Sequence, residues 1–203
     1  NTVSCALRCN FCGCEVLKMR EITVKVYAFA ELSDDAQERA LNGFRNLNYG
    51  INVGDGYWWY DTYDTIRAAG KLLGLEIGEI HFDTDSYCTF DAHYRYVRGA
   101  VKAVRNEFPW VDDLCKAAKD LQDLQKRHFY SLSCNVSSQR NTNSYRCFRF
   151  GEDYECDDLG DLLDDFAHWA WGLLCDEYDW LTSDGAIREM IDEYEFTEAG
   201  DLL

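Results

Sequence analysis

A long helix with one apolar and one acidic face is the feature that most constrains how this chain folds. Between Leu159 and Tyr178, apolar residues recur at steps of three and four, the period of a helix packed on a core. The acidic positions are Asp157, Asp158, Asp161, Asp164, Asp165, Asp176, Glu177 and Asp179. At about 1.5 Å per residue they span roughly 35 Å, or about one charge per 4 Å, near the ~3.4 Å axial charge spacing of one DNA strand.

The negative charge of the chain lies in its last quarter. Residues 1–150 hold 19 basic and 19 acidic residues, whereas residues 151–203 hold 18 acids and one base, Arg188, which accounts for the net charge of −17. A surface of this sign repels nucleic acid and anionic membranes and attracts basic proteins. We therefore expect no direct binding to nucleic acid or membrane. A purely solubilising role is the competing interpretation, although solubilising surfaces normally mix both signs.

The remaining patterns predict an α+β fold in one domain, residues 19–203. We expect an antiparallel sheet of about five strands in hairpins, covered by several helices, with the long acidic helix near the C-terminus. Alternating apolar residues predict a strand over 21–30, and Ser33 is a candidate N-cap for the helix that follows. A second helix should end at Gly74. Further elements are expected near 75–83, 87–97, 111–127 and in a hairpin over 129–150.

The location expected for this protein is the cytoplasm of a host cell. No apolar run approaches the roughly 20 residues that span a bilayer, and the first residues lack the apolar core of a signal peptide. The cysteines beyond residue 80 are spaced as single buried residues rather than as a disulfide framework. Cys134 and Cys147 are the exception, because paired hairpin strands would let them face each other and oxidise.

Four cysteines near the N-terminus form a candidate cofactor site. Cys5, Cys9 and Cys12 have the C-x3-C-x2-C spacing and resemble the cluster loop of radical S-adenosylmethionine enzymes, in which three thiolates bind a [4Fe–4S] cluster. Adding Cys14 gives four thiolates, with a spacing tighter than is usual for structural zinc. No barrel of alternating strands and helices follows. We therefore interpret residues 1–18 as a disordered or foreign extension and expect no cofactor.

A second candidate metal site lies on the predicted hairpin near residue 85. His81 and Asp83 alternate on one strand, and Asp91 and His93 alternate on the next. In a suitable register the two histidines and two carboxylates share one sheet face and could bind zinc, manganese or iron. A solvated hairpin face is the alternative, because a one-residue shift in register would scatter the set.

Several stretches from Met19 onward resemble an uncharacterised family of small acidic proteins. They are MREITVKVYAFAELSDDAQERAL, YWWYDTYDTIRAAGKLLGLEI, YRYVRGAVKAV, LQDLQKRHFYSL, DWLTSD and YEFTEAG. The resemblance covers about nine-tenths of the chain and implies an origin in phages, prophages or plasmids, where members are sometimes labelled antitoxins. It transfers no catalytic residues. It implies a compact acidic inhibitor, either a mimic of nucleic acid or an antitoxin that masks a basic partner.

The sequence thus predicts an acidic protein that blocks a basic, nucleic-acid-handling surface. The partner would be a basic host or defence protein, or a cognate toxin, and the eight carboxylates of the long helix would bind it. Two other classes stay open. One is a metal-dependent or iron–sulfur enzyme at the candidate sites above, and the other is a regulatory or virion-associated protein. The sequence does not indicate the oligomeric state.

Overall fold

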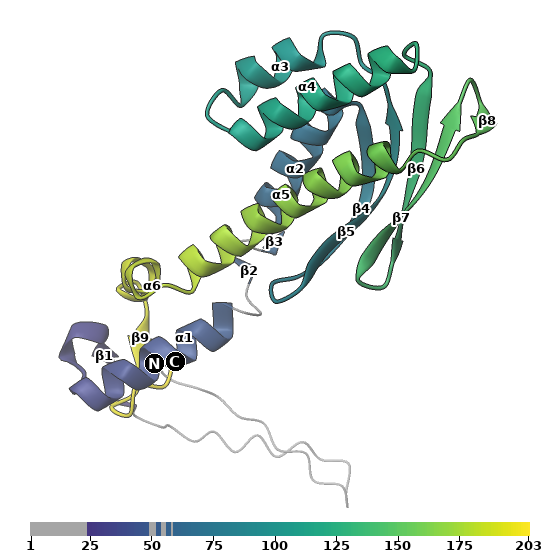
Figure 1. Cartoon of the computed structure of the whole chain (residues 1–203). Helices are drawn as coiled ribbons and strands as arrows, with labels where there is room; N and C mark the ends of the chain where they lie inside the picture. The colour runs from purple at the N-terminus through teal and green to yellow at the C-terminus, as the bar shows by residue number, and fades with distance from the viewer. Residues whose placement is uncertain (1–23, 49–51, 54–55, 58) are drawn as a thin grey trace, which may run out of the picture. The chain divides into compact units, whose positions relative to one another are not determined.

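The computed structural model describes residues 24–48, 52–53, 56–57 and 59–203 (Figure 1). These residues group into two compact units. Unit 1 combines two segments from the ends of the chain, one up to Gly50 and one from Leu181 to Leu203, and unit 2 is Ile51–Trp180. The extension over 1–18 lies outside the described residues, and the single domain over 19–203 stays a prediction.

Unit 1 is a small helical unit closed by two short strands. Its elements are β1 (Tyr27–Ala28), the 3-10 helix η1 (Phe29–Glu31), α1 (Asp34–Asn48), α6 (Asp184–Ile191) and β9 (Glu195–Phe196). The N-terminal strand predicted over 21–30 is wrong in extent, because the structure has only the two residues of β1 there and residues 21–23 lie outside the described part. The partner strand β9 is equally short, so the ladder has nothing further to pair with.

The core of unit 1 joins residues from both ends of the chain. The ring of Phe196 is fully buried and lies 6.3 Å from that of Phe29, and the apolar face of α1 packs against them. The Ser33 hydroxyl accepts a hydrogen bond from the Ala36 amide at 3.4 Å, which confirms the predicted N-cap. Gly200 has φ +88°, and a Cβ there would lie 2.2 Å from the Ala36 carbonyl oxygen, so only glycine fits.

Unit 2 is built on a five-stranded antiparallel sheet in the order β4-β5-β6-β7-β8. The strands are β4 (Leu75–Asp83), β5 (Tyr87–Arg95), β6 (Leu132–Gln139), β7 (Thr142–Arg149) and β8 (Glu152–Asp153), and a separate pair is formed by β2 (Asn52–Val53) and β3 (Gly56–Tyr57). The helices are α2 (Tyr60–Leu73), α3 (Ala100–Glu107), α4 (Asp112–Arg127) and α5 (Asp157–Leu181). Figure 1 shows these helices on one side of the sheet. The α+β prediction is confirmed.

A buried glutamine joins α4 to the sheet. Gln125 is fully buried, and its amide nitrogen donates to the Leu132 carbonyl at 2.8 Å and to the Tyr94 hydroxyl at 3.3 Å. Its amide oxygen accepts from the Leu132 amide at 3.2 Å. The side chain therefore pairs both backbone polar groups of the first residue of β6, which fixes where this strand begins.

The sharp exit from α2 also follows the prediction. Gly74 ends the helix with φ +94°, and a Cβ there would lie 2.0 Å from the Arg95 carbonyl oxygen. No other residue type tolerates both that backbone conformation and that contact. Among the described residues, no helix has the length and apolar character needed to cross a membrane.

Candidate functional site: the acidic face of the long helix

The long helix has the two faces that its sequence predicts. Its buried residues lie against the sheet and are Leu159, Leu163, Phe166, Ala167, Ala170 and Leu174. The exposed acids are Asp157, Asp158, Asp161, Asp164, Asp165, Asp176 and Asp179. At 100° per residue these positions fall within about 120° of one another around the helix axis. We call them the acidic face.

Glu177 does not belong to this face. It lies five helical turns after the buried Leu159 and is half-buried on the core side of the helix. The acidic face is also uneven along its length, because about 16 Å of helix separates Asp165 from Asp176. The acidic face therefore consists of a dense N-terminal group, Asp157 to Asp165, and a smaller C-terminal group.

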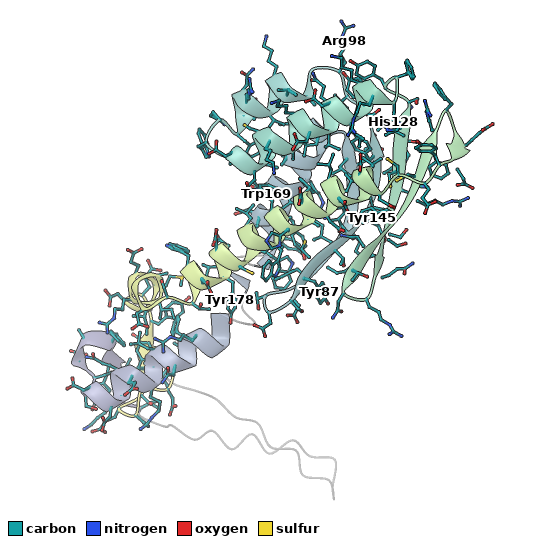
Figure 2. All side chains as sticks on the ribbon, viewed as in Figure 1. Tyr87, Arg98, His128, Tyr145, Trp169 and Tyr178 are labelled. Atoms are coloured by element: carbon teal, nitrogen blue, oxygen red, sulfur yellow. The ribbon has the colours of Figure 1, made fainter. Side chains whose placement is uncertain are left out.

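Two carboxylates of the dense group have partners within unit 2. Asp158 pairs with Arg127 of α4 at 3.3 Å. Asp164 accepts a hydrogen bond from the Tyr145 hydroxyl of β7 (Figure 2). Burial of the phenol raises the pKa of Tyr145, and the neighbouring carboxylate raises it further, so Tyr145 stays protonated. Asp164 thus helps to fix α5 on the sheet.

The other acids of the dense group have no such partner. For Asp157, Asp161 and Asp165, the described residues supply no side-chain hydrogen bond or ion pair. An exposed carboxylate without an internal partner contributes little to folding and adds repulsion to its neighbours at i,i+4. These three carboxylates are available to an external cation.

A pocket opens beside the dense group, between α4 and α5. Its volume is about 180 Å³. Leu114, Ala117 and Phe166 form its apolar lining, and the half-buried indole of Trp169 lies on α5 (Figure 2). The polar lining is Asp113, Lys116, Asp120, Asp165 and His168.

The chemistry of this pocket suits a guanidinium or ammonium group. Three carboxylates, one lysine and one histidine line it beside the Trp169 indole, and carboxylates and indoles are the groups that bind such cations. Asp113 and Asp120 were not predicted as site residues. A signal was present, because a spacing of seven residues places both on the same face of α4. Which helix that face meets depends on packing and could not be inferred from the sequence.

A second pocket of about 390 Å³ lies on the other side of α5. Its lining includes Tyr87, Thr89, Asn143, Asp164 and Trp171. Several of these groups are already paired: the Asn143 side chain accepts from the Phe90 amide at 3.0 Å, and the Trp171 indole donates to the Asp83 carbonyl at 3.0 Å. These bonds hold the hairpin ends to α5, so we assign this pocket a structural role.

The hairpin histidines and aspartates do not form a metal cluster. The β4–β5 register places His81 opposite Thr89 and Asp83 opposite Tyr87. The four candidates therefore share one sheet face but are offset along it, and neither histidine lies directly opposite an aspartate of the set. His93 instead contacts the Asn135 side chain at 2.7 Å, and Asp91 accepts from the Ser138 amide. Within the described part of the chain, no three His, Cys, Asp or Glu residues are grouped for a metal ion. Cys5, Cys9, Cys12 and Cys14 lie outside that part.

The cysteine pair of the second hairpin is placed as predicted. Cys134 and Cys147 are directly opposite each other on β6 and β7, and their sulfur atoms are 3.3 Å apart. Both are reduced and buried. Their mutual hydrogen bond raises the pKa of Cys134 and lowers that of Cys147, so Cys147 is the thiol that ionises first.

Comparison with known proteins gives a family without an assigned role. The family model described as "Domain of unknown function (DUF8835)" matches residues 58–184. The match spans the sheet, the helices over it and the acidic face. No curated protein and no solved structure matches the chain.

Proposed function

The chain belongs to the DUF8835 family, and we propose that it binds a basic protein through the acidic face and the pocket beside it. The partner would use that basic surface to hold nucleic acid, so occupying it would block the partner. The observation that carries this proposal is the pocket between α4 and α5, where Asp113, Asp120 and Asp165 surround an apolar floor next to Trp169.

Charge alone does not select one partner, whereas this pocket offers a specific site for a single basic side chain of the partner. Arginine is enriched among the residues that dominate binding energy at interfaces, and it needs a desolvated site with carboxylates and an aromatic face. The neighbouring Asp157 and Asp161 would then attract the surrounding basic surface and speed association. A solubilising surface requires charge but no such pocket.

The resemblance to small acidic proteins of phages, prophages and plasmids supports the same proposal. Within it, an inhibitor of a host defence protein and an antitoxin against a basic nuclease are the two forms that the resemblance suggests. Both would act in the cytoplasm of the host. The geometry does not favour a metal-dependent enzyme at the β4–β5 hairpin, because the described residues contain no group of three potential ligands there.

The test compares two triple variants with the parent chain. The pocket variant combines Asp113→Asn, Asp120→Asn and Asp165→Asn. The control combines Asp61→Asn, Glu76→Gln and Glu107→Gln, which removes the same charge from exposed positions of unit 2 outside the pocket. Tagged proteins would capture partners from a nuclease-treated lysate of the source cells, and each captured protein would be purified for affinity measurements.

We expect the parent and the control to bind the same partner and the pocket variant to bind it more than tenfold more weakly. Affinity should also fall steeply with salt, because exposed charges are screened beyond about 8 Å at physiological ionic strength. Added nucleic acid should compete. A partner that binds all three proteins equally, or one that nucleic acid leaves in place, would refute the proposal.

A further inference from the structure

A rim of aromatic and basic side chains lies at one end of the sheet. Three segments meet there: 94–98 (YRYVR) at the end of β5, 126–130 (KRHFY) between α4 and β6, and 145–150 (YRCFRF) at the end of β7. Together they contain six arginine or lysine residues and no acid, in a chain of net charge −17. We call the surface formed by these segments the rim.

Contacts between neighbouring strands bring the three segments together. Arg95 lies opposite Ser133 of β6, and Leu132 lies opposite Arg149 of β7. The rings of Tyr96 and Tyr130 are 4.7 Å apart, and the Phe150 amide donates to the Ser131 carbonyl at 3.2 Å. Figure 2 shows Arg98 and His128 at this end of the unit. The rim is therefore one continuous surface.

The aromatic side chains of the rim are unusually exposed. Phe129 is 74% exposed, Phe150 72% and Tyr130 47%. These same three residues have φ between 55° and 58°, the left-handed region in which a non-glycine residue is strained. Burial therefore does not explain why aromatic residues occupy these turn positions.

The basic groups of the rim are also incompletely paired. Arg127 and Arg146 form ion pairs with Asp158 and Asp153. Within the described residues, Arg95 and Arg98 have no ion pair, and the buried atoms His128 Nδ1 and Arg149 Nε have no hydrogen-bond partner. Both of these buried groups pack against the Tyr154 ring. The Arg149 Nε–H is a buried donor without a partner, which is costly, so an anion that reached it would be favoured.

We propose that the rim binds single-stranded nucleic acid, whose bases stack on Phe129, Phe150 and Tyr130 and whose phosphates pair with Arg95 and Arg98. A single strand supplies both exposed π faces and a regular anionic backbone, the combination that such surfaces recognise. In a duplex the faces of the bases are stacked inside the helix and cannot contact the exposed rings of the rim. An acidic protein could pair with the arginines but has no regular series of aromatic faces to stack on the rings. The rim adjoins the acidic face through the Arg127–Asp158 ion pair, but its proposed ligand is a different one. The proposal departs from the expectation that the chain does not contact nucleic acid.

The test measures fluorescence polarisation of labelled oligothymidylate and oligouridylate of about 12 nucleotides, within the site size of about 4–16 nucleotides seen for such surfaces. A duplex of equal length and a polyglutamate peptide are the competing ligands. The ring variant combines Phe129→Gly and Phe150→Gly. Glycine accepts φ near 55°, so this variant should melt no lower than the parent and yet bind the single strand at least tenfold more weakly.

A charge variant separates phosphate contacts from stacking. Arg95→Gln with Arg98→Gln should weaken binding and reduce the slope of log affinity against log salt by about 1.4, at about 0.7 per phosphate contact. Two controls should bind like the parent. Trp110→Ala removes a ring that is 79% exposed near the other end of α4, and Lys102→Gln with Lys119→Gln removes two charges from exposed positions on α3 and α4.

The pocket variant keeps this test independent of the proposed function. Removing its three carboxylates should leave oligonucleotide binding unchanged or make it tighter, whatever becomes of the basic partner. The rim proposal is overturned if the single strand does not bind at low salt, if the duplex binds as tightly, or if the ring variant binds like the parent. Binding of polyglutamate in place of the oligonucleotide would assign the rim to an acidic protein instead.

Discussion

Replacing Gln125 with leucine should cost unit 2 a large part of its stability. Leucine fills a similar volume, so the loss comes from hydrogen bonding and not from a cavity. The change removes both bonds to Leu132 and the bond to the Tyr94 hydroxyl. Each buried polar group left without a partner costs about 1–3 kcal/mol, so the two backbone groups of Leu132 together cost about 2–6 kcal/mol.

Urea denaturation and thermal melting would measure this loss. A central value of about 4 kcal/mol corresponds to a fall in Tm of roughly 10–20 °C for a unit of this size. Gln122→Leu is the matched control, because Gln122 is on the same helix and half-exposed, and it should shift stability by about 0.5 kcal/mol or less. A Gln125→Leu variant within about 1 kcal/mol of the parent would refute the reasoning.

Gln125→Glu tests which half of the amide matters. An ionised carboxylate can still accept from the Leu132 amide, but it cannot donate to the Leu132 carbonyl. A buried glutamate has its pKa raised above about 4.3, so its protonated form is favoured on folding. That contribution is present below the unfolded-state pKa and is lost as the pH rises through the folded-state pKa. This variant should therefore gain stability relative to the parent as the solution is acidified.

Three further predictions follow from the packing of the sheet. Phe166→Ala should cost about 3–5 kcal/mol in urea denaturation, because Phe166 is buried and meets the Phe90 ring edge-on at 5.8 Å; a smaller loss than Trp110→Ala would contradict this. Glutathione disulfide should slowly convert Cys134 and Cys147 to a disulfide. The Cys147 thiolate attacks first, and two glutathione thiols leave in the two exchange steps. Peptide mapping would show the cross-link, and its formation only in urea would contradict the facing position of the two thiols in the folded protein. Tyr145→Phe should reduce the loss of stability above pH ~10. The pKa of Tyr145 is raised in the folded state, so its stabilising contribution is present below the unfolded-state pKa and is lost as the pH rises through the folded-state pKa. Equal losses of stability at alkaline pH in the variant and the parent would exclude Tyr145 as a cause.

Local patterns predicted the elements of this fold better than its surfaces. The apolar period of α5, the glycine at position 74 and the hairpin over 129–150 each depend on residues close together in the sequence, so the sequence displays them directly. The position of Cys134 opposite Cys147 followed from one hairpin and was confirmed, whereas their oxidation stays a prediction. The short β1 was overestimated, because strand length depends on a partner from the far end of the chain.

The pocket and the rim could not be predicted in the same way. Asp113 and Asp165 meet only because α4 and α5 pack side by side, and the rim gathers three strand ends from distant parts of the sequence. A signal for the rim existed, since each segment mixes aromatic and basic residues without an acid. Gln125 had a signal too: it stands one helical turn after the buried Leu121, in an apolar position.

The composition of unit 1 from both ends of the chain has a consequence for synthesis on the ribosome. The apolar face of α1 is covered by Ile187, Ile191 and Phe196, which are translated after the whole of unit 2. At roughly 5–20 residues per second, the intervening segment takes about 7–26 s to emerge. Unit 2 has its own core and can fold during that interval. The side chain of Phe44 on α1 stays exposed, because the residues that cover it have not yet been synthesised. We therefore expect the apolar face of α1 to be exposed on the nascent chain until Ile187, Ile191 and Phe196 have emerged.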